Sequence, residues 1–334
     1  GLGDVYKRQT PYTVNHKGFG PAWHNSLFED NAEFGFGMTL AQNAIHDRLK
    51  ENVEKIAELS SDEEVKAAVA KYVDTLTDSK ASREATDALI EKLEVIAGGD
   101  GEAAELAKKT LIDKDSLAKK SMWIFGGDGW AYDIGFGGLD HVIASGKNVN
   151  ILVFDTEVYS NTGGQASKAT PVGSVAQFAA TGKSTKKKDL AAIAMSYGYV
   201  YVAQVAMGAD YNQCVKAFAE AESYNGPSII IAYAPCINHG IKGGMGISQI
   251  EEKKAVAAGY WNIFRFDPRL ADEGKNPFML DGKAPSESYR DFIMGEVRYN
   301  SLTRSFPERA EELFEKAEKV AAEKYEHLEK LAGK

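Results

Sequence analysis

Residues 121–138 read SMWIFGGDGWAYDIGFGG, a short apolar run followed directly by a glycine-rich turn. The apolar run is typical of a buried strand. In open α/β sheets, ligands bind beyond the carboxyl ends of the strands, where glycines let the backbone approach a phosphate and the next helix presents its positive end. The carboxylate of Asp128 suits a hard cation such as Mg²⁺. Alone, however, a Gly-Asp-Gly triplet is more often an ordinary turn.

A second strand-like run, NVNILVFD, leads into the turn TEVYSNTGGQ at residues 156–165. Thr156 lies 28 residues after Asp128, which leaves room for one crossover helix between adjacent parallel strands. Both turns would then meet at one edge of the sheet. The Thr156 hydroxyl and the Val158 carbonyl could join Asp128 as Mg²⁺ ligands, with diphosphate oxygens and water in the other positions. Asn161 would point its amide into the same crevice. The alternative is two strand–helix turns without a ligand.

Strand and helix signals alternate over residues 121–265. Two further strands are expected at 199–205 and 228–233, and two helices at 189–196 and 211–224. This alternation predicts an α/β fold, with a parallel sheet flanked by helices.

A helical insertion is expected over residues 39–120, where charged residues and alanine dominate. Leu89, Leu93 and Ile96 follow helical spacing. Ser61 followed by Glu64 has the pattern of a capping box.

The ends of the chain have a different character. Residues 10–38 are rich in Gly, Asn and aromatic residues, and we expect an irregular segment that lines a site. Residues 1–9 contain DVYKRQ, which one reading frame of a sequencing adapter would encode, and we expect them to be a non-native leader. A C-terminal extension is expected over 266–334, with Ser305 and Glu308 capping a final helix whose Leu313, Ala317, Val320, Leu328 and Leu331 share one face.

The overall composition excludes several classes of function. The 334 residues carry a formal net charge of −9, which argues against binding nucleic acid or an anionic membrane. No apolar run approaches the roughly 20 residues that cross a bilayer, and no secretory signal opens the chain. Two cysteines, Cys214 and Cys236, cannot build a disulfide framework, so a cytoplasmic protein is the default expectation.

The two turns and the segment between them carry a family resemblance. The stretch GDGWAYDIGFGGLDHVIASGKNVNILVFDTEVYSNTGGQASKATP is very similar to the thiamine-diphosphate motif of the pyruvate:ferredoxin (flavodoxin) oxidoreductases. Thiamine-diphosphate enzymes in general place an Asn ligand some 25–30 residues after GDG, whereas this family uses Thr, as here. The resemblance extends to TPYT, GPAWHNSLFEDNAEFGFGM, APCINHGI, EGKNPFMLD and RSFPE, and it is weakest over residues 39–118.

The resemblance implies the thiamine-diphosphate-binding part of an enzyme that oxidatively decarboxylates pyruvate to acetyl-CoA and CO₂. Electrons would pass through iron–sulfur clusters to ferredoxin or flavodoxin, and coenzyme A would accept the acetyl group. The other domains of the enzyme would be partners, and the full-length enzyme would be a homodimer. Because the parts of the family that bind substrate and activate the cofactor's pyrimidine are missing, we expect no turnover by this chain alone.

Site residues follow from the resemblance position by position. Asp128, Thr156 and the carbonyl of Val158 correspond to the Mg²⁺ ligands, and Asn161 to a residue beside the substrate and the reacting carbon. Cys236, in APCINHGI, corresponds to the last of four cysteines that hold the 4Fe-4S cluster nearest the cofactor; the other three precede TPYT in the family and are not in this chain. The stretches that hold the cofactor correspond to Gly127, Asp128, Gly129, Trp130, Thr156, Glu157, Val158, Tyr159, Ser160 and Asn161.

Other interpretations stay open at this stage. A non-oxidative thiamine-diphosphate lyase or synthase would need no cluster, and a phosphate-binding module without catalysis would need neither Thr156 nor Asn161. From the residues alone, Cys236 is a partly buried thiol, and Cys214 packs within a helix. The run KSTKKK, residues 183–188, is expected to be a solvated loop; the alternatives are contacts with an acidic ferredoxin or flavodoxin or with coenzyme A phosphates. His24 and His239 are expected to be ordinary hydrogen-bonded histidines.

Overall fold

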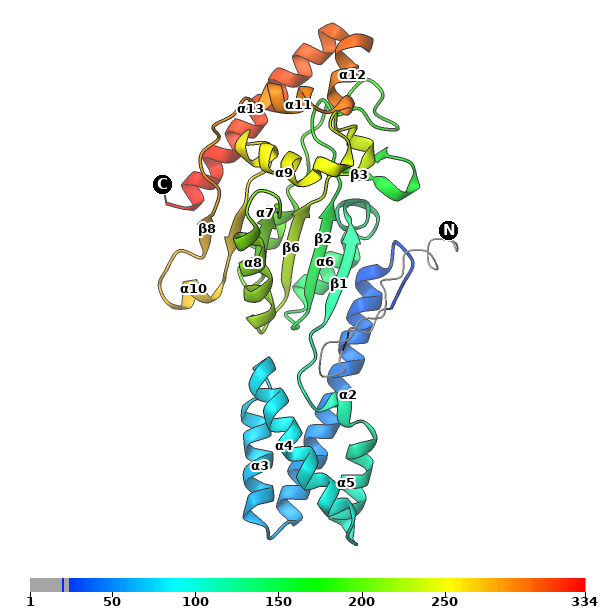
Figure 1. Ribbon diagram of the computed structural model, residues 1–334, viewed down its shortest axis with the longest axis vertical. Helices are drawn as coiled ribbons and strands as arrows, with labels where there is room; N and C mark the ends of the chain where they lie inside the picture. The colour runs from blue at the N-terminus through cyan, green and yellow to red at the C-terminus, as the bar shows by residue number, and fades with distance from the viewer. Residues whose placement is uncertain (1–19, 21–23, 334) are drawn as a thin grey trace.

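The computed structural model describes residue 20 and residues 24–333. The expectations for residues 1–9 and for TPYT therefore lie outside the described residues. The described chain has an α/β body, coloured teal to red in Figure 1, and a lobe of helices that extends away from one end of it. Within the described part, no helix is both long enough and apolar enough to span a membrane.

A six-stranded sheet in the order β1-β2-β6-β5-β7-β8 forms the centre of the body. The first four strands in this order pair in parallel, whereas β7 pairs antiparallel with β5 and β8 pairs antiparallel with β7. The four expected strands are therefore present, and the sheet is mostly parallel, as the sequence predicts. The strands are β1 (Trp123–Gly127), β2 (Asn150–Asp155), β5 (Tyr201–Val205), β6 (Ser228–Tyr233), β7 (Phe264–Phe266) and β8 (Phe278–Leu280); β3 (Val158–Tyr159) and β4 (Gln165–Ala166) form a separate antiparallel pair.

Alternate side chains of the strands enter two different cores, as the period of two in a strand requires. Ile151 and Val153 pack in a core with α6 (Phe136–Ala144) and α7 (Leu190–Met195). Leu152 faces the opposite side of the sheet, where Cys214 and its helix α8 (Tyr211–Ser223) pack. Cys214 is thus a buried packing residue, as predicted.

The helical lobe has a core of its own, with Leu89 and Leu93 fully buried and Ile96 packed against them. Its helices are α2 (Asn31–Leu59), α3 (Glu63–Asp74), α4 (Ser79–Ala97), α5 (Glu102–Ile112) and the short η1 (Lys114–Ser116). The expectation of irregular structure up to residue 38 is wrong for residues 31–38, which are the first turns of α2. Gly35 has no side chain, which lets α2 pack closely against Ile124 of β1, because a Cβ at this position would collide with Ile124. This packing compensates for the low helix propensity of glycine.

Both predicted capping boxes are wrong by one residue. The N-cap of α3 is Asp62, whose carboxylate accepts from the Glu64 amide, because Asp competes with Ser as a cap and lies closer to the helix. The last helix, α13 (Pro307–Leu331), has Phe306 at its N-cap and begins with Pro307, whose ring pre-sets the helical φ. Leu313, Ala317 and Leu328 of α13 are buried, as expected, but Leu331 is exposed.

The C-terminal part of the body contains more regular structure than the sequence indicates. Strands β7 and β8 were missed because three residues each are too short to show a period of two. The remaining elements are η2 (Gly129–Ile134), η3 (Ser160–Thr162), η4 (Ile237–His239), η5 (Met245–Ile247), α9 (Ser248–Ala257), α10 (Arg269–Asp272), α11 (Tyr289–Met294) and α12 (Val297–Ser305).

Candidate functional site

The two turns that the sequence singles out meet at the carboxyl edge of the sheet. Strands β1 and β2 are parallel neighbours, with Gly127 paired to Phe154. Asp128 follows the first strand, and its Oδ1 accepts hydrogen bonds from the Thr156 amide (3.2 Å) and from Thr156 Oγ1 (2.7 Å). The expectation that a crossover would bring both turns to one edge is confirmed.

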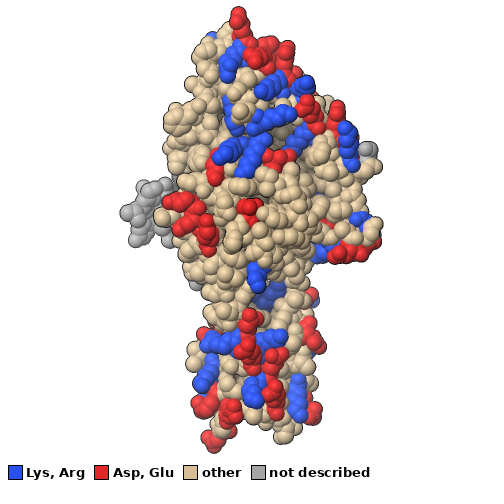
Figure 2. Space-filling model, turned by 180° about the vertical axis from the view of Figure 1, so that it is seen from behind, with Lys and Arg blue, Asp and Glu red and all other residues tan. Residues whose placement is uncertain are grey.

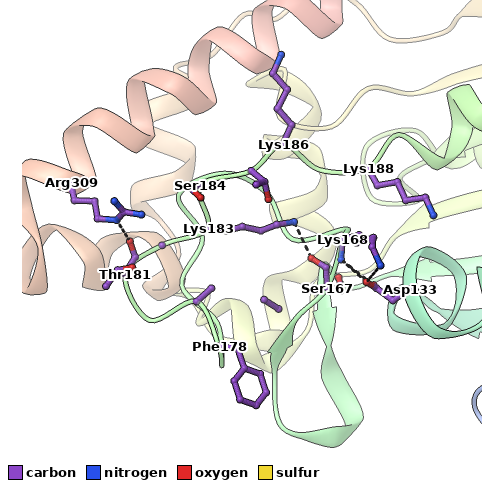
Figure 3. A pocket seen from close by; sticks show the side chains of 14 residues that line it. Asp133, Ser167, Lys168, Phe178, Thr181, Lys183, Ser184, Lys186, Lys188 and Arg309 are labelled. Atoms are coloured by element: carbon purple, nitrogen blue, oxygen red, sulfur yellow. Dashed lines mark hydrogen bonds and ion pairs between the residues drawn. The ribbon is translucent and has the colours of Figure 1, made fainter.

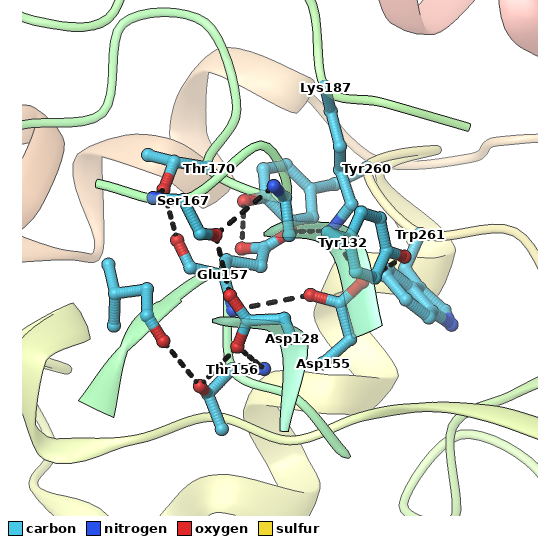
Figure 4. A network of polar contacts seen from close by, with 12 residues as sticks. Asp128, Tyr132, Asp155, Thr156, Glu157, Ser167, Thr170, Lys187, Tyr260 and Trp261 are labelled. Carbon is cyan, nitrogen blue, oxygen red and sulfur yellow. Dashed lines mark hydrogen bonds and ion pairs between the residues drawn. The ribbon is translucent and has the colours of Figure 1, made fainter. Parts of the chain in front are cut away.

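Oxygen atoms converge around the Thr156 hydroxyl. Its Oγ1 lies 3.0 Å from the carbonyl oxygen of Val158 and accepts a 3.0 Å hydrogen bond from Ser160 Oγ. The second carboxylate oxygen of Asp128 accepts from Ser167 Oγ at 2.6 Å (Figure 4). One carboxylate, three hydroxyls and a carbonyl therefore meet in a space of hydrogen-bond dimensions, and such oxygens are the ligands that Mg²⁺ prefers.

Mg²⁺ fits this donor set better than a softer metal does. In residues 24–333 no group of three or more His, Cys, Asp or Glu side chains could hold a metal ion. A site here would therefore depend on hydroxyl and carbonyl oxygens beside one carboxylate. Without further ligands, such a site would bind a metal ion weakly. The donor set suits a Mg²⁺ ion that the protein and substrate phosphates bind together.

Two glycines let the first turn pack against aromatic rings. A Cβ at Gly129 would lie 2.6 Å from the ring of Tyr159, and a Cβ at Gly126 would lie 2.2 Å from the ring of Trp130. The turn continues into a short π-helix, in which the Gly135 amide donates to the Trp130 carbonyl at 2.9 Å. Such π-turns often mark functional sites, and this one keeps the backbone beside Asp128 compact.

The Asp128 carboxylate lies in an environment that opposes its negative charge. It is almost fully buried, and burial, with the charge of Asp155, raises the pKa of Asp128 to about 7. Hydrogen bonds from Ser167 and Thr156 only partly offset this effect. Among the residues that the structure describes, no Lys or Arg forms an ion pair with Asp128, so a cation at the oxygen cluster would meet a carboxylate that still needs positive charge.

Glu157 holds the two proposed ligands of the second turn in place from behind. Its φ of 60° lies in the left-handed region, which costs a non-glycine residue on the order of 1–3 kcal/mol and persists only where the surroundings enforce it. Its amide donates to Asp155 Oδ1, and its carbonyl accepts from Thr170 Oγ1. This conformation turns the backbone so that Thr156 Oγ1 and the Val158 carbonyl face each other.

Buried ion pairs stabilise the Glu157 side chain. Lys187 Nζ lies 3.0 Å from Glu157 Oε1, Arg298 lies 2.8 Å from Oε2, and the Tyr260 hydroxyl donates to Oε2 at 2.6 Å. Burial alone would raise the pKa of Glu157, but Lys187 and Arg298 lower it to about 2. Glu157 is therefore a permanent anion that orders the turn.

The same network reaches two more buried carboxylates. Lys187 also pairs with Asp155 at 2.8 Å (Figure 4), and Arg298 also pairs with Glu296 at 2.7 Å. Because every one of these side chains is largely withdrawn from water, losing any one partner would leave a buried charge without compensation.

His239 connects the second turn to the turn that carries Cys236. Its Nε2 lies 2.9 Å from the Thr156 carbonyl oxygen, so this nitrogen carries a proton, and its Nδ1 lies 3.6 Å from Glu296 Oε1. His239 is fully buried and closes η4, for which half-buried Cys236 is the N-cap. His239 is therefore a hydrogen-bonded histidine, as predicted, and it contacts the backbone of the second turn.

The chain is similar to known proteins over most of its length. Residues 99–232 match the family described as thiamine pyrophosphate enzyme, C-terminal TPP binding domain. Pyruvate:ferredoxin oxidoreductase of Moorella thermoacetica is 59% identical over 96% of this chain, and pyruvate-flavodoxin oxidoreductase of Klebsiella pneumoniae is 54% identical over 97% of it. The chain is related to one segment of these oxidoreductases. It spans 27% of the length of each of the two relatives.

A solved structure was also found at low similarity. It is 2-oxoglutarate:ferredoxin oxidoreductase from Magnetococcus marinus with 2-oxoglutarate, coenzyme A and succinyl-CoA bound. The match covers 55% of this chain and 68% of that chain, at 19% identity and a TM-score of 0.35. Similarity at this level carries no argument about this chain.

The structure brings three of the predicted site residues together and places the others at different distances from them. Asp128, Thr156 and Val158 come together, and exposed Asn161 follows them in η3. Cys236 lies in the turn that follows the neighbouring strand β6, at the N-cap of η4, and His239 of η4 contacts the Thr156 carbonyl. Cys214 lies in the core on the opposite side of the sheet from Ile151 and Val153.

Sequence reasoning missed Ser167 and the network behind Glu157. The run 183–188 was expected to be solvated, but Lys187 points inward to Asp155 and Glu157, and Lys183 donates to the carbonyls of Ser167 and Thr170. In the sequence, nothing distinguishes a lysine that points into the protein from the other lysines of the same run. A signal was available in DTE at residues 155–157, 30 residues before Lys187, whose two carboxylates need a counter-ion if they are buried.

Proposed function

We propose that this chain holds Mg²⁺ and thiamine diphosphate for the oxidative decarboxylation of pyruvate to acetyl-CoA, within an enzyme of the pyruvate:ferredoxin or flavodoxin type. The observation that carries the proposal is the convergence of Asp128, Thr156 and Val158 oxygens at the carboxyl edge of two parallel strands. The two relatives named above are called oxidoreductases of pyruvate with ferredoxin or flavodoxin. These substrates, together with coenzyme A and the other domains of the enzyme, are the partners that we propose.

Each part of the site has a distinct task in this proposal. Asp128, Thr156 and Val158 would hold Mg²⁺, and the backbone from Gly127 to Trp130 and from Thr156 to Asn161 would hold the cofactor. Thiamine diphosphate, when bound, supplies the carbon chemistry. Glu157 and its ion pairs keep the second turn rigid, and the buried network excludes water from the rear of the site.

Calorimetric titration tests the proposal directly. Thiamine diphosphate should bind the 334-residue chain in Mg²⁺ and much more weakly in EDTA, because the oxygen cluster contains a single carboxylate and the diphosphate needs a bridging cation. Ca²⁺ in place of Mg²⁺ is the control for a generic cation effect. Metal-independent binding of equal affinity would reject the assignment of the oxygen cluster.

Asn161→Ala should lower turnover more than cofactor affinity. Asn161 is exposed in η3, which follows the second turn, and we propose that its amide orients substrate rather than metal. In the assembled enzyme we expect a loss of about 10²-fold in kcat with a nearly unchanged dissociation constant for the cofactor. Asn238→Ala, on the neighbouring turn, is the control. Normal kcat with lost cofactor binding would reverse the assignment.

Cys236→Ser separates the oxidoreductase from the lyase alternative. A 4Fe-4S cluster commonly takes four thiolates, and within residues 24–333 the one other cysteine, Cys214, is buried in a helix of the α8 core. The described residues therefore cannot hold a cluster alone, and we propose Cys236 as one ligand among cysteines from the rest of the enzyme.

Two proteins test this assignment by iron and sulfide analysis with electron paramagnetic resonance. The 334-residue chain purified without oxygen should carry no stable cluster. In the assembled enzyme, Cys236→Ser should perturb one cluster and sharply reduce ferredoxin reduction, because a serine hydroxyl is a poor ligand for cluster iron. Cys214→Ser is the matched control. Unchanged cluster signals with full ferredoxin reduction would remove Cys236 from the site and favour the lyase.

A further inference from the structure

The turn that carries Cys236 packs against the second turn of the site at two points. His239 Nε2 lies 2.9 Å from the Thr156 carbonyl oxygen, across 83 positions of sequence. Asn238 lies against Gly164, where an added Cβ would come within 2.8 Å of Asn238 Oδ1. The segment that contains η4 and the segment that contains two of the proposed Mg²⁺ ligands are therefore in direct contact.

Backbone contacts hold η4 in place on its other side. Gly240 follows η4 with a left-handed φ of 64°, and its carbonyl accepts from the Val297 amide at 2.9 Å. The Lys242 amide donates to the Gly295 carbonyl at 3.1 Å. Because these bonds involve main-chain atoms alone, a substitution of the His239 side chain should leave the path of this backbone intact.

The imidazole ring of His239 is held in one orientation. The Tyr233 ring stacks on it with a distance of 6.1 Å between ring centroids. Its Nδ1 lies 3.6 Å from Glu296 Oε1, and Arg298 pairs with the other oxygen of that carboxylate at 2.7 Å. All four side chains are buried. His239 Nε2 therefore points to the Thr156 carbonyl in surroundings where water does not compete for it.

The peptide unit between Thr156 and Glu157 is bound at both of its polar atoms. His239 donates to its carbonyl oxygen, and Asp155 Oδ1 accepts from its N–H at 3.2 Å. A peptide unit is planar, so the two bonds fix the orientation of the whole plane and with it the left-handed φ of Glu157. Since the Thr156 amide is bound to Asp128, the backbone on both sides of the Thr156 hydroxyl is fixed.

The other hydroxyl that donates to Asp128 is supported in a comparable way. Ser167 Oγ donates to Asp128 Oδ2 at 2.6 Å, and the Ser167 carbonyl accepts from Lys183 Nζ at 2.9 Å (Figure 3). Each of these two hydroxyls thus belongs to a residue whose carbonyl is bound by a side chain from another segment. The two supports differ in origin, because Lys183 belongs to the loop before α7, whereas His239 belongs to the turn of Cys236.

We propose that His239 is a positioning residue, which fixes the peptide plane between Thr156 and Glu157 and thereby couples the second turn to the turn that carries Cys236. The inference rests on the proposed function, in which Thr156 binds Mg²⁺ and Cys236 binds a cluster. A ligand that is held in place before the metal arrives loses little freedom when it binds, and groups that support metal ligands contribute to affinity in this way. The same contact keeps Cys236 in a fixed position relative to the proposed cofactor.

Two amide substitutions separate this role from packing. In His239→Gln, the amide nitrogen comes near the position of Nε2 and can donate to the Thr156 carbonyl. In His239→Asn, the shorter side chain reaches only the position of Nδ1, beside Glu296. Hydrogen–deuterium exchange of the 334-residue chain without cofactor reports local opening of the second turn. Residues 155–165 should exchange about tenfold faster in His239→Asn, as expected for one lost hydrogen bond, and at nearly the original rate in His239→Gln.

Two further measurements connect the position of this peptide with function. In calorimetric titrations, His239→Asn should weaken the Mg²⁺-dependent binding of thiamine diphosphate about tenfold or more, the usual loss when a group that supports a metal ligand is removed. His239→Gln should retain nearly the affinity of the unsubstituted chain. In the assembled enzyme, His239→Asn should also alter the electron paramagnetic resonance signal of one cluster, and His239→Gln should restore it.

His46 offers a matched control. Its Nε2 lies 3.0 Å from the Leu117 carbonyl oxygen in the helical lobe, so the contact is of the same kind but does not involve the site. Figure 2 shows charged side chains of both signs over the surface of this lobe, where water can replace a lost partner. His46→Asn should leave the exchange of residues 155–165, the cofactor affinity and the cluster signal unchanged. Urea denaturation verifies that each variant is folded.

Failure of this inference and failure of the proposed function give different results. If the unsubstituted chain binds the cofactor with Mg²⁺ but His239→Asn and His239→Gln match it in exchange and affinity, the positioning role is overturned and the proposed function stands. If His239→Asn alone exchanges faster and no chain binds the cofactor, the positioning of the peptide is supported and the proposed function is rejected. An unchanged cluster signal in His239→Asn would overturn the coupling to Cys236.

Discussion

Asp128→Ala is expected to abolish Mg²⁺-dependent retention of thiamine diphosphate and to lower turnover of the assembled enzyme by orders of magnitude. The substitution removes the single carboxylate of the oxygen cluster, to which the Thr156 amide and hydroxyl and the Ser167 hydroxyl all donate. The remaining hydroxyl and carbonyl oxygens are neutral, and neutral oxygens alone bind Mg²⁺ poorly. Equilibrium dialysis of the cofactor and steady-state kinetics measure both effects.

Two further variants distinguish metal binding from a structural effect. Asp128→Asn keeps one acceptor oxygen and the side-chain volume, so the fold should persist while Mg²⁺-dependent affinity is still lost. Asp133→Asn removes a carboxylate five residues away that pairs with Lys168, and it should retain the cofactor. Near-normal activity of Asp128→Ala at saturating cofactor would be incompatible with the assignment.

Arg298→Met is expected to lower the free energy of unfolding by about 3 kcal/mol or more. Arg298 is buried and pairs with two buried carboxylates, Glu157 and Glu296. A methionine of similar length would fill the space but leave both anions with too little compensation. Glu157 would lose part of what holds its left-handed backbone, so Mg²⁺-dependent cofactor affinity should fall as well. Urea denaturation and calorimetry measure the two effects.

Arg290→Met is the matched control for this prediction. Arg290 also pairs with two carboxylates, Glu311 and Glu318, but at the surface, where exposed pairs contribute about 1 kcal/mol or less. The Arg290→Met variant should therefore unfold at nearly the same urea concentration as the unsubstituted protein and bind the cofactor normally. Equal stabilities for the two variants would mean that water reaches the network around Glu157.

The sequence determined which two turns would meet at the carboxyl edge of the sheet. Two signals were sufficient for this prediction: a strand pattern before each of Asp128 and Thr156, and a spacing that fits one crossover helix. A crossover connection makes the two strands parallel, so their carboxyl ends lie at the same edge of the sheet. For the same reason the four parallel strands were predicted and the three-residue strands β7 and β8 were not: a short antiparallel strand depends on its partner rather than on its own pattern.

Tertiary structure alone decided which polar residues support the site. Glu157 and Arg298 are 141 positions apart in the chain, yet their ion pair is buried, and Lys187 differs from its exposed neighbour Lys186 only in the direction that it points. Burial and charge pairing arise from contacts between distant segments, and local sequence patterns contain no record of them. The sequence therefore named the side chains that meet in the oxygen cluster, and the fold selected those that hold them in place.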